Sequence, residues 1–396
     1  MGGRLFFTVA HLALTLAAGL SVASAPSNAA QKETTPLAPA PLPAPRASVN
    51  AFISGHSLTD LPMPQHLEAI ANSLGTPLQW NRQYVVGSSI KARSRGVDGA
   101  APWSGYRAGV DKAGQPIDVL AELKQPAGIR GRYDTLVITE QHGLLGSLTW
   151  NDTVRHLRHF HDRFVEANPG GTTYFYEPWL GLDNKSDPKR WVAYERAASP
   201  VWQCIATRIN TSLAAEGRTD RIRSVPVALA LAGLIDKATQ GQGLAGVTLG
   251  DARSTVDGLV KDRVHLTETG SYFAALVTYA FVWGRSPVGA WHPQPVSPST
   301  ASALQYAVWE FATSHARTRV PLTLDQCQET LRRSFIQQYW SYARDVSWIA
   351  EMGAWRANLR WARYVLQWQW WIRRNTASNP FHFDPTRDQE YWFADH

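Results

Sequence analysis

Short apolar runs alternate with amphipathic segments over most of this chain. The apolar or alternating runs predict strands at residues 48–53, 78–86, 133–139, 172–176 and 224–231. Between and after them, apolar residues at helical spacing predict helices at residues 64–74, 117–123, 152–167, 191–215, 267–283 and 299–317. Strands that alternate with helices favour right-handed crossovers and a mostly parallel sheet covered on both faces, so we expect an α/β fold.

The first 47 residues have a different pattern. Arg4 is the only charge ahead of an apolar run at residues 5–22, and small residues continue to Ala30, as in a cleaved secretory signal. We therefore expect an exported protein, periplasmic or secreted, with a retained membrane anchor as the alternative. Residues 31–47 are rich in proline and alanine, which is typical of a flexible or polyproline-II linker.

The pattern changes again in the C-terminal extension, residues 319–396. Eight of the chain's 17 tryptophans fall here, at positions 340, 348, 355, 361, 368, 370, 371 and 392. Arginine supplies most of the charge and lysine is absent, so we expect a helical, Trp- and Arg-rich extension that breaks at Gly353. Three interpretations stay open: the extension packs on the main domain (48–318), lies in a membrane interface, or binds polysaccharide or a second copy.

Charge and cysteine content narrow the classes of function. The formal net charge of +7 is spread without runs of Lys or Arg, which gives little support to nucleic-acid binding. Cys204 and Cys327 could form a disulfide in an oxidising compartment, and two free buried thiols are the alternative. His156, His159 and His161 have no matching second pair of metal ligands, so we interpret them as part of a solvated helix face.

Two distant stretches carry residues suited to nucleophilic catalysis. Ser57 follows the first predicted strand, and Asp262 and His265 lie three residues apart more than 200 residues later. A serine hydroxyl needs a base to take its proton, and an acceptor must hold that imidazole in one tautomer. His265 would be the base and Asp262 the acceptor. The backbone N–H groups of Ser57 and Gly87 would stabilise the oxyanion that develops on an attacked carbonyl.

This arrangement resembles the SGNH, or GDSL-type, serine hydrolases. Their serine motif matches Gly55-His56-Ser57-Leu58, their second-strand glycine matches Gly87, and their Asp-x-x-His matches residues 262–265. The resemblance covers about residues 48–318 and implies a flavodoxin-like three-layer α/β/α sandwich. It departs from the family where an asparagine of a Gly-x-Asn motif should give an oxyanion donor: residues 140–143 read Glu-Gln-His-Gly. Gln141 is the favoured substitute, and Asn151 is the alternative.

Four further side chains are candidates for substrate binding. They are Trp103, His142, Trp150 and Trp179, all in loops after strands, and core packing is the alternative for the tryptophans. The sequence thus predicts an exported serine esterase that needs no metal or cofactor. Its expected substrates are acyl esters, most plausibly O-acetyl groups on carbohydrate. An O-acyltransferase with the same residues and an inactive polysaccharide-binding protein are the alternatives.

Overall fold

A five-stranded, all-parallel sheet forms the centre of the protein. The structure is a computed structural model that describes residues 41–240, 243–374 and 379–394. The strands are β1 (Val49–Gly55), β2 (Leu78–Tyr84), β3 (Thr135–Thr139), β4 (Thr172–Tyr176) and β5 (Ile222–Val225). Their order, β2-β1-β3-β4-β5, is that of flavodoxin-like doubly wound folds. The expected α/β architecture is therefore confirmed.

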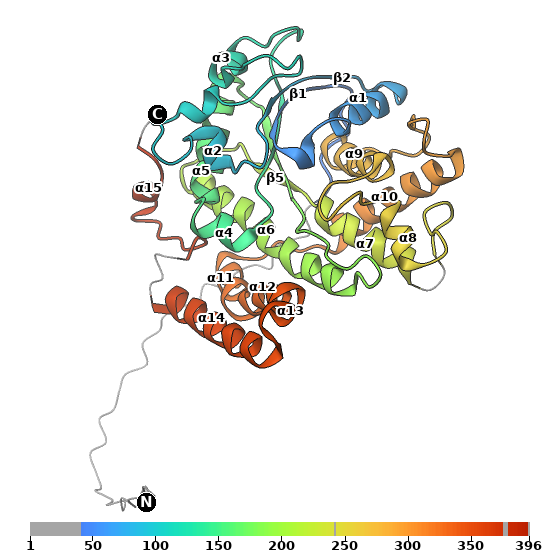
Figure 1. Ribbon diagram of the computed structural model, residues 1–396. Coiled ribbons are helices and arrows are strands. Elements are labelled where there is room, and N and C mark those ends of the chain that lie inside the picture. The colour runs from blue at the N-terminus through green and yellow to red at the C-terminus, as the bar shows by residue number, and fades with distance from the viewer. Residues whose placement is uncertain (1–40, 241–242, 375–378, 395–396) are drawn as a thin grey trace, which may run out of the picture. The chain divides into compact units, whose positions relative to one another are not determined.

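Helices cover both faces of this sheet (Figure 1). One layer contains α1 (Met63–Ser73), α7 (Val227–Thr239), α9 (Glu268–Trp283) and α10 (Pro298–Thr318). The other contains α2 (Ile90–Ser94), α3 (Val119–Lys124) and α5 (Thr153–Ala167), with α6 (Lys189–Ala215) beside α5 and α7. The shorter elements are η1 (Ser57–Thr59), η2 (Ser104–Arg107), α4 (Leu144–Thr149) and α8 (Ala252–Asp257).

Burial of the strands on both faces explains their composition. All five residues of β3 are buried, and its core is the continuous apolar run Leu136, Val137 and Ile138. Such runs are expected in parallel strands, which have no solvent-facing side. The sheet therefore fixes the carboxyl ends of β1, β2 and β3 at one edge of the molecule, where loops can carry functional side chains.

One strand prediction was partly wrong. The run at 224–231 was expected to be a strand, but β5 ends at Val225 and α7 begins at Val227. Pro226 separates the two elements, because its fixed φ suits the first turn of a helix and its missing N–H cannot extend a ladder. The apolar residues that follow are buried as the inner face of α7. Because the apolar run continues from β5 into α7, the pattern alone did not show where the strand ends and the helix begins.

The interpretation of the three histidines of α5 was also wrong. His156, His159 and His161 are buried, with exposed fractions of 3%, 7% and 0%. His161 lies between Thr173 on β4 and the Asp220 carboxylate, at 2.8 and 2.6 Å. The segment that contains η2 covers the outward side of α5, where the Tyr106 hydroxyl hydrogen bonds to His159 at 2.8 Å. The polar pattern of α5 therefore reflects buried hydrogen bonds and not contact with water.

At the N-terminal side, the predicted signal and residues 31–40 of the predicted linker lie outside the described residues. The end of that linker packs on the main domain: Leu42 contacts the core, and the Arg46 guanidinium donates to Thr135 Oγ1 at 2.6 Å. Arg46 also pairs with Asp134 at 2.5 Å. The chain is thus fastened at the amino-terminal side of β3 immediately before β1 begins.

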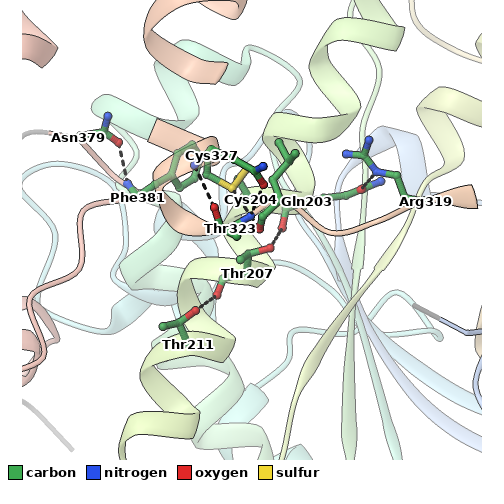
Figure 2. The surroundings of a disulfide bond; sticks show 11 residues. Gln203, Cys204, Thr207, Thr211, Arg319, Thr323, Cys327, Asn379 and Phe381 are labelled. Carbon is green, nitrogen blue, oxygen red and sulfur yellow. Dashed lines mark hydrogen bonds between the residues drawn. A yellow bond between two sulfur atoms is a disulfide. The ribbon is translucent and has the colours of Figure 1, made fainter. Parts of the chain in front are cut away.

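The C-terminal extension forms a group of helices beside α6. It contains α11 (Leu324–Glu329), the π-helical turns η3 (Thr330–Phe335) and η4 (Arg344–Trp348), α12 (Ile336–Ala343), α13 (Ile349–Met352), α14 (Ala354–Arg374) and α15 (Asp388–Tyr391). A disulfide joins Cys204 of α6 to Cys327 of α11 (Figure 2). Near it, Arg319 donates to Gln203 Oε1 at 2.7 Å. The start of the extension is therefore covalently attached to the main domain.

Two further contacts hold the extension. Tyr342 of α12 donates its hydroxyl to the Gly181 carbonyl at 2.7 Å, and its ring packs on Tyr194 of α6. At the other end, the buried Arg208 guanidinium pairs with the Asp388 carboxylate. These anchors run along α6 and agree with the interpretation that the extension packs on the main domain.

We predict that the disulfide stabilises the protein substantially. The bond closes a loop with a sequence separation of 123 residues, and restricting the unfolded chain in this way is worth about 5 kcal/mol on the chain-entropy model. A Cys204→Ala/Cys327→Ala variant should lose up to that amount of unfolding free energy, measured by urea denaturation. Adding a reductant should not change the variant further. Equal midpoints for the variant and the parent protein would contradict the prediction.

Candidate active site

Ser57 lies at the carboxyl end of β1, in the first position of the turn η1. The turn is tight: a Cβ on Gly55 would lie 1.8 Å from Thr59 Oγ1, so only glycine fits there. The Val85 N–H donates to the Gly55 carbonyl at 3.1 Å, which ties the end of β1 to the end of β2. The local sequence therefore places the Ser57 hydroxyl at the edge of the sheet, half-buried and facing a cavity.

His56 stabilises this turn as a neutral imidazole. Its Nε2 donates to the Glu140 carbonyl at 2.9 Å, and its Nδ1 accepts from the Leu58 N–H at 3.4 Å. Burial, and then the neighbouring Arg93, lower the pKa of His56 to about 3. An imidazole with both nitrogens occupied and so low a pKa cannot serve as the base for Ser57. It joins the serine turn to the loop after β3 instead.

Asp262 and His265 form a hydrogen-bonded pair in the loop before α9. Asp262 Oδ1 accepts from the N–H groups of Val264 and His265 at 2.8 and 2.9 Å, and Oδ2 meets His265 Nδ1 at 2.7 Å. Partial burial favours the neutral acid, but these hydrogen bonds outweigh it and hold the pKa of Asp262 well below its ordinary value. Because Nδ1 donates to the carboxylate, Nε2 is left to accept a proton.

Ser57 and His265 line the same cavity. It has a volume of about 530 Å³, and Tyr84, Trp179 and Glu268 also contribute to its walls. Within the described structure, no hydrogen bond joins Ser57 Oγ to His265 Nε2. Catalytic hydrogen bonds are often long in a free enzyme and shorten when substrate binds. The structure thus brings the two distant sequence stretches to one cavity, with the Asp262–His265 contact already made.

The candidate oxyanion donors meet beside the end of β2. Gly87 has a φ of 60°, in the left-handed region that glycine adopts without strain. Gln141 Nε2 donates to the Gly87 carbonyl at 3.3 Å, and Asn151 Nδ2 donates to Gln141 Oε1 at 3.3 Å. Gln141 therefore lies next to Gly87, and Asn151 contacts the Gln141 amide.

A buried guanidinium that the sequence analysis missed lies beneath these loops. Arg93 of α2 is fully buried, and its Nε donates to Ser54 Oγ of β1 at 3.0 Å. Its Nη1 donates to the Ser88 carbonyl and hydroxyl at 2.9 and 2.8 Å, and its Nη2 donates to the Thr139 carbonyl at the end of β3. One side chain thus joins the ends of β1 and β3 to the loop after β2.

Glu140 is the second missed residue. Its buried carboxylate accepts from the Gln141 N–H at 2.6 Å and from Thr153 Oγ1 at 2.7 Å. Burial raises the pKa of Glu140, whereas the nearby Arg93 charge and these donors oppose the rise. Glu140 therefore positions the loop that carries Gln141, while its carbonyl holds His56. An acid directly after a buried strand was the only signal for it in the sequence.

The structure separates the four candidate substrate-binding residues. Trp179 lines the 530 Å³ cavity, and its indole donates to the Val264 carbonyl at 2.7 Å. His142 lies close to His56, with ring centroids 6.4 Å apart, and burial followed by the neighbouring His265 lowers the pKa of His142. Trp150 is 70% exposed and contacts Trp368 of α14. Trp103 stacks on His159 of α5 with centroids 3.7 Å apart and does not line the cavity of Ser57.

The sequence neighbours of Trp179 and His265, Leu180 and Val264, line a second cavity, to which the C-terminal extension also contributes. It has a volume of about 400 Å³ and is lined by His142, Arg263 and Val264 on one side and by Tyr339 and Tyr342 on the other. A larger cavity of about 820 Å³ lies elsewhere, among arginines of α5 and the loop before β5. Among the described residues, no group of three His, Cys, Asp or Glu side chains could hold a metal ion.

Comparisons with known proteins find only distant likenesses. No protein-family model matches the chain, and a search of curated proteins finds no significant match. A DUF4886 family protein from Bacteroides uniformis is similar in structure, with a TM-score of 0.46, 14% identity, and coverage of 69% of this chain and 98% of that one. The periplasmic domain of a lipopolysaccharide acetyltransferase from Salmonella ser. Paratyphi A has a TM-score of 0.34, 13% identity, and coverage of 60% and 83%. These likenesses are too distant to carry a functional argument.

The low pKa of His56 predicts a loss of stability in acid. The unfolded chain binds a proton at His56 near pH 6.5, whereas the folded chain does so only near pH 3. Stability is therefore complete above pH 6.5 and falls as the pH decreases, by about 2 kcal/mol at pH 5 from this group. A His56→Gln variant should lose about that much less than the parent between pH 7.5 and 5, by urea denaturation. The same loss in both proteins would exclude the buried neutral imidazole.

Proposed function

We propose that the protein is an exported serine esterase of the SGNH type that cleaves acyl esters through an acyl-enzyme. The observation that carries this proposal is that the Asp262–His265 pair and Ser57 line one cavity at the carboxyl edge of the sheet. Ser57 and His265 are more than 200 positions apart in the sequence, and the fold brings them together at that edge. The oriented imidazole of His265 would supply the base, and the Ser57 hydroxyl would supply the nucleophile that acyl transfer needs.

The reaction has two steps. Ser57 Oγ attacks the ester carbonyl while His265 Nε2 takes the hydroxyl proton, and collapse of the tetrahedral intermediate breaks the ester C–O bond. The proton passes from His265 to the departing alkoxide, which leaves as the alcohol. A water molecule then attacks the acyl-enzyme, His265 takes its proton and returns it to Ser57, and the carboxylic acid leaves. Asp262 keeps Nδ1 protonated throughout and stabilises the imidazolium.

The oxyanion of each intermediate would be held by the N–H groups of Ser57 and Gly87 and by the Gln141 side chain. Three hydrogen bonds hold Gln141 beside Gly87. Its side-chain Nε2 donates to the Gly87 carbonyl, its Oε1 accepts from Asn151, and its backbone N–H donates to the Glu140 carboxylate. Fixed donors of this kind stabilise developing charge because they need no reorganisation during the reaction. Gln141 is thus the functional counterpart of the asparagine that the SGNH pattern has at this point.

The proposed substrate is an acyl ester, an O-acetyl group carried on a larger molecule such as a carbohydrate. The 530 Å³ cavity would hold the ester, and the 400 Å³ cavity offers room for a further part of the substrate beside Arg263 and Tyr339. The Cys204–Cys327 disulfide fits a protein that works in an oxidising compartment, which supports export.

We predict that Ser57→Ala and Asp262→Asn each lower kcat for p-nitrophenyl acetate by about a thousandfold or more, because each removes part of one catalytic unit. The exposed Ser186 offers a matched control, and Ser186→Ala should keep the parent activity. Full activity of Ser57→Ala would exclude the mechanism. Acyl transfer to a polysaccharide acceptor, with little free acid formed, would instead identify the acyltransferase alternative.

The assignment of the third oxyanion donor predicts an order of effects. Gln141→Leu removes the amide itself and should lower kcat by roughly 10²- to 10³-fold, as loss of such a donor does elsewhere. Asn151→Leu removes only a contact to that amide and should have a smaller effect. Steady-state kinetics on both variants, with KM reported separately, make the comparison. A larger loss of kcat for Asn151→Leu than for Gln141→Leu would instead make Asn151 the oxyanion donor and Gln141 its support.

A further inference from the structure

Helix α14 has one packed face and one open face. Ala357, Val365 and Ile372 are buried, at 0%, 7% and 2% exposed, and they mark the side that packs on the rest of the extension. On this side Trp361 donates its indole N–H to Ser341 of α12 at 3.0 Å, and Tyr364 stacks near Trp340. The helix is therefore held in a fixed orientation, and the residues opposite the packed side form a defined surface.

Large apolar side chains occupy this opposite surface, which we call the α14 outer face. Trp355, Leu359 and Leu366 are 75%, 53% and 67% exposed. At about 100° per residue they fall within an arc of about 40°, so they form a single ridge along the helix. Trp370, 57% exposed, continues the ridge. A contiguous apolar patch of this kind on a protein surface usually marks an interaction site.

Positive charge accompanies the ridge. Helix α14 contains five arginines and no acidic residue. Arg356, Arg363 and Arg373 are exposed, and no acidic side chain of the described structure forms an ion pair with them. Arg360, in contrast, stacks over Trp348 on the packed side. The outer face therefore combines an apolar ridge with guanidinium groups whose charges have no partner within the described protein.

From this combination we propose that α14 binds the surface of a membrane that contains anionic phospholipids. The helix would lie in the interface plane, with Trp355, Leu359 and Leu366 in the acyl-chain boundary and the arginines on lipid phosphates. Across the described residues, no helix is long and apolar enough to span a bilayer. The ester-cleaving site would then work close to a membrane surface.

Charge and side-chain shape favour this occupant over two others. A second copy of the chain would bring arginine against arginine across a symmetric contact, and like charges placed together oppose association. A sugar chain stacks on flat aromatic rings, whereas Leu359 and Leu366 offer branched aliphatic groups. A lipid surface, unlike these two, uses the leucines, the tryptophan and the arginines together, since guanidinium groups suit phosphate oxygens.

Flotation of the full chain with vesicles tests the proposal without measuring activity. Vesicles of 30% phosphatidylglycerol in phosphatidylcholine should bind the protein at least tenfold more tightly than pure phosphatidylcholine, and high salt should weaken binding. Leu359→Gln/Leu366→Gln and Arg356→Gln/Arg363→Gln/Arg373→Gln should each reduce binding about tenfold or more. Leu249→Gln/Tyr306→Gln, which changes two exposed apolar residues outside the extension, should bind like the parent.

Three outcomes would overturn the proposal. The first is failure of the folded parent protein to float with anionic vesicles. The second is binding that both sets of α14 variants leave unchanged. The third is a dimer, or a complex with an acidic polysaccharide, that depends on Leu359 and Leu366 when no vesicle binding occurs. Circular dichroism of each variant confirms that the substitutions, all at exposed positions, leave the fold intact.

Discussion

The buried guanidinium of Arg93 is the interaction on which the site depends most. A buried charge must be hydrogen bonded on every side, because an unpaired one costs several kcal/mol. Arg93 meets this requirement with Ser54 of β1, Ser88 after β2 and the Thr139 carbonyl of β3. Ser57, Gly87 and Gln141 each lie within three residues of one of these contacts. The need to satisfy one buried cation therefore fixes the spacing of Ser57, Gly87 and Gln141.

Polar groups around Arg93 also hold the loops that carry Ser57 and Gln141. Ser54 Oγ donates to Gln83 Oε1 at 2.9 Å, and Glu140 accepts from the backbone of both Ile90 and Gln141. His56 closes the set by donating to the Glu140 carbonyl. The Asp262–His265 loop is held separately, by Trp179 and by the Leu182 N–H on the Arg263 carbonyl at 2.7 Å. Ser57 and His265 are thus held in place by two separate sets of contacts.

Periodicity and local spacing in the sequence predicted the sheet. They also predicted that Ser57 and His265 lie together, and both line the same cavity. Strand ends place Ser57 and Gly87, and an Asp three residues before a His can reach the same ring. Arg93 and Glu140 were missed because each looks like an ordinary charged residue until the fold surrounds it with hydrogen-bond partners from distant segments. The same limit explains α5, where histidines that pattern alone assigns to solvent are covered by chain from elsewhere. Trp103 is part of that covering chain, since its ring stacks on His159.

The central claim is that Ser57 is the nucleophile activated by His265, and covalent trapping tests it most directly. The folded protein would be treated with a fluorophosphonate, digested, and examined by mass spectrometry to locate the adduct. The account predicts one phosphonate on the peptide that contains Ser57, and little or none in a His265→Ala variant that keeps its fold. A folded protein that stays unlabelled at Ser57, or that labels equally without the His265 imidazole, would contradict it.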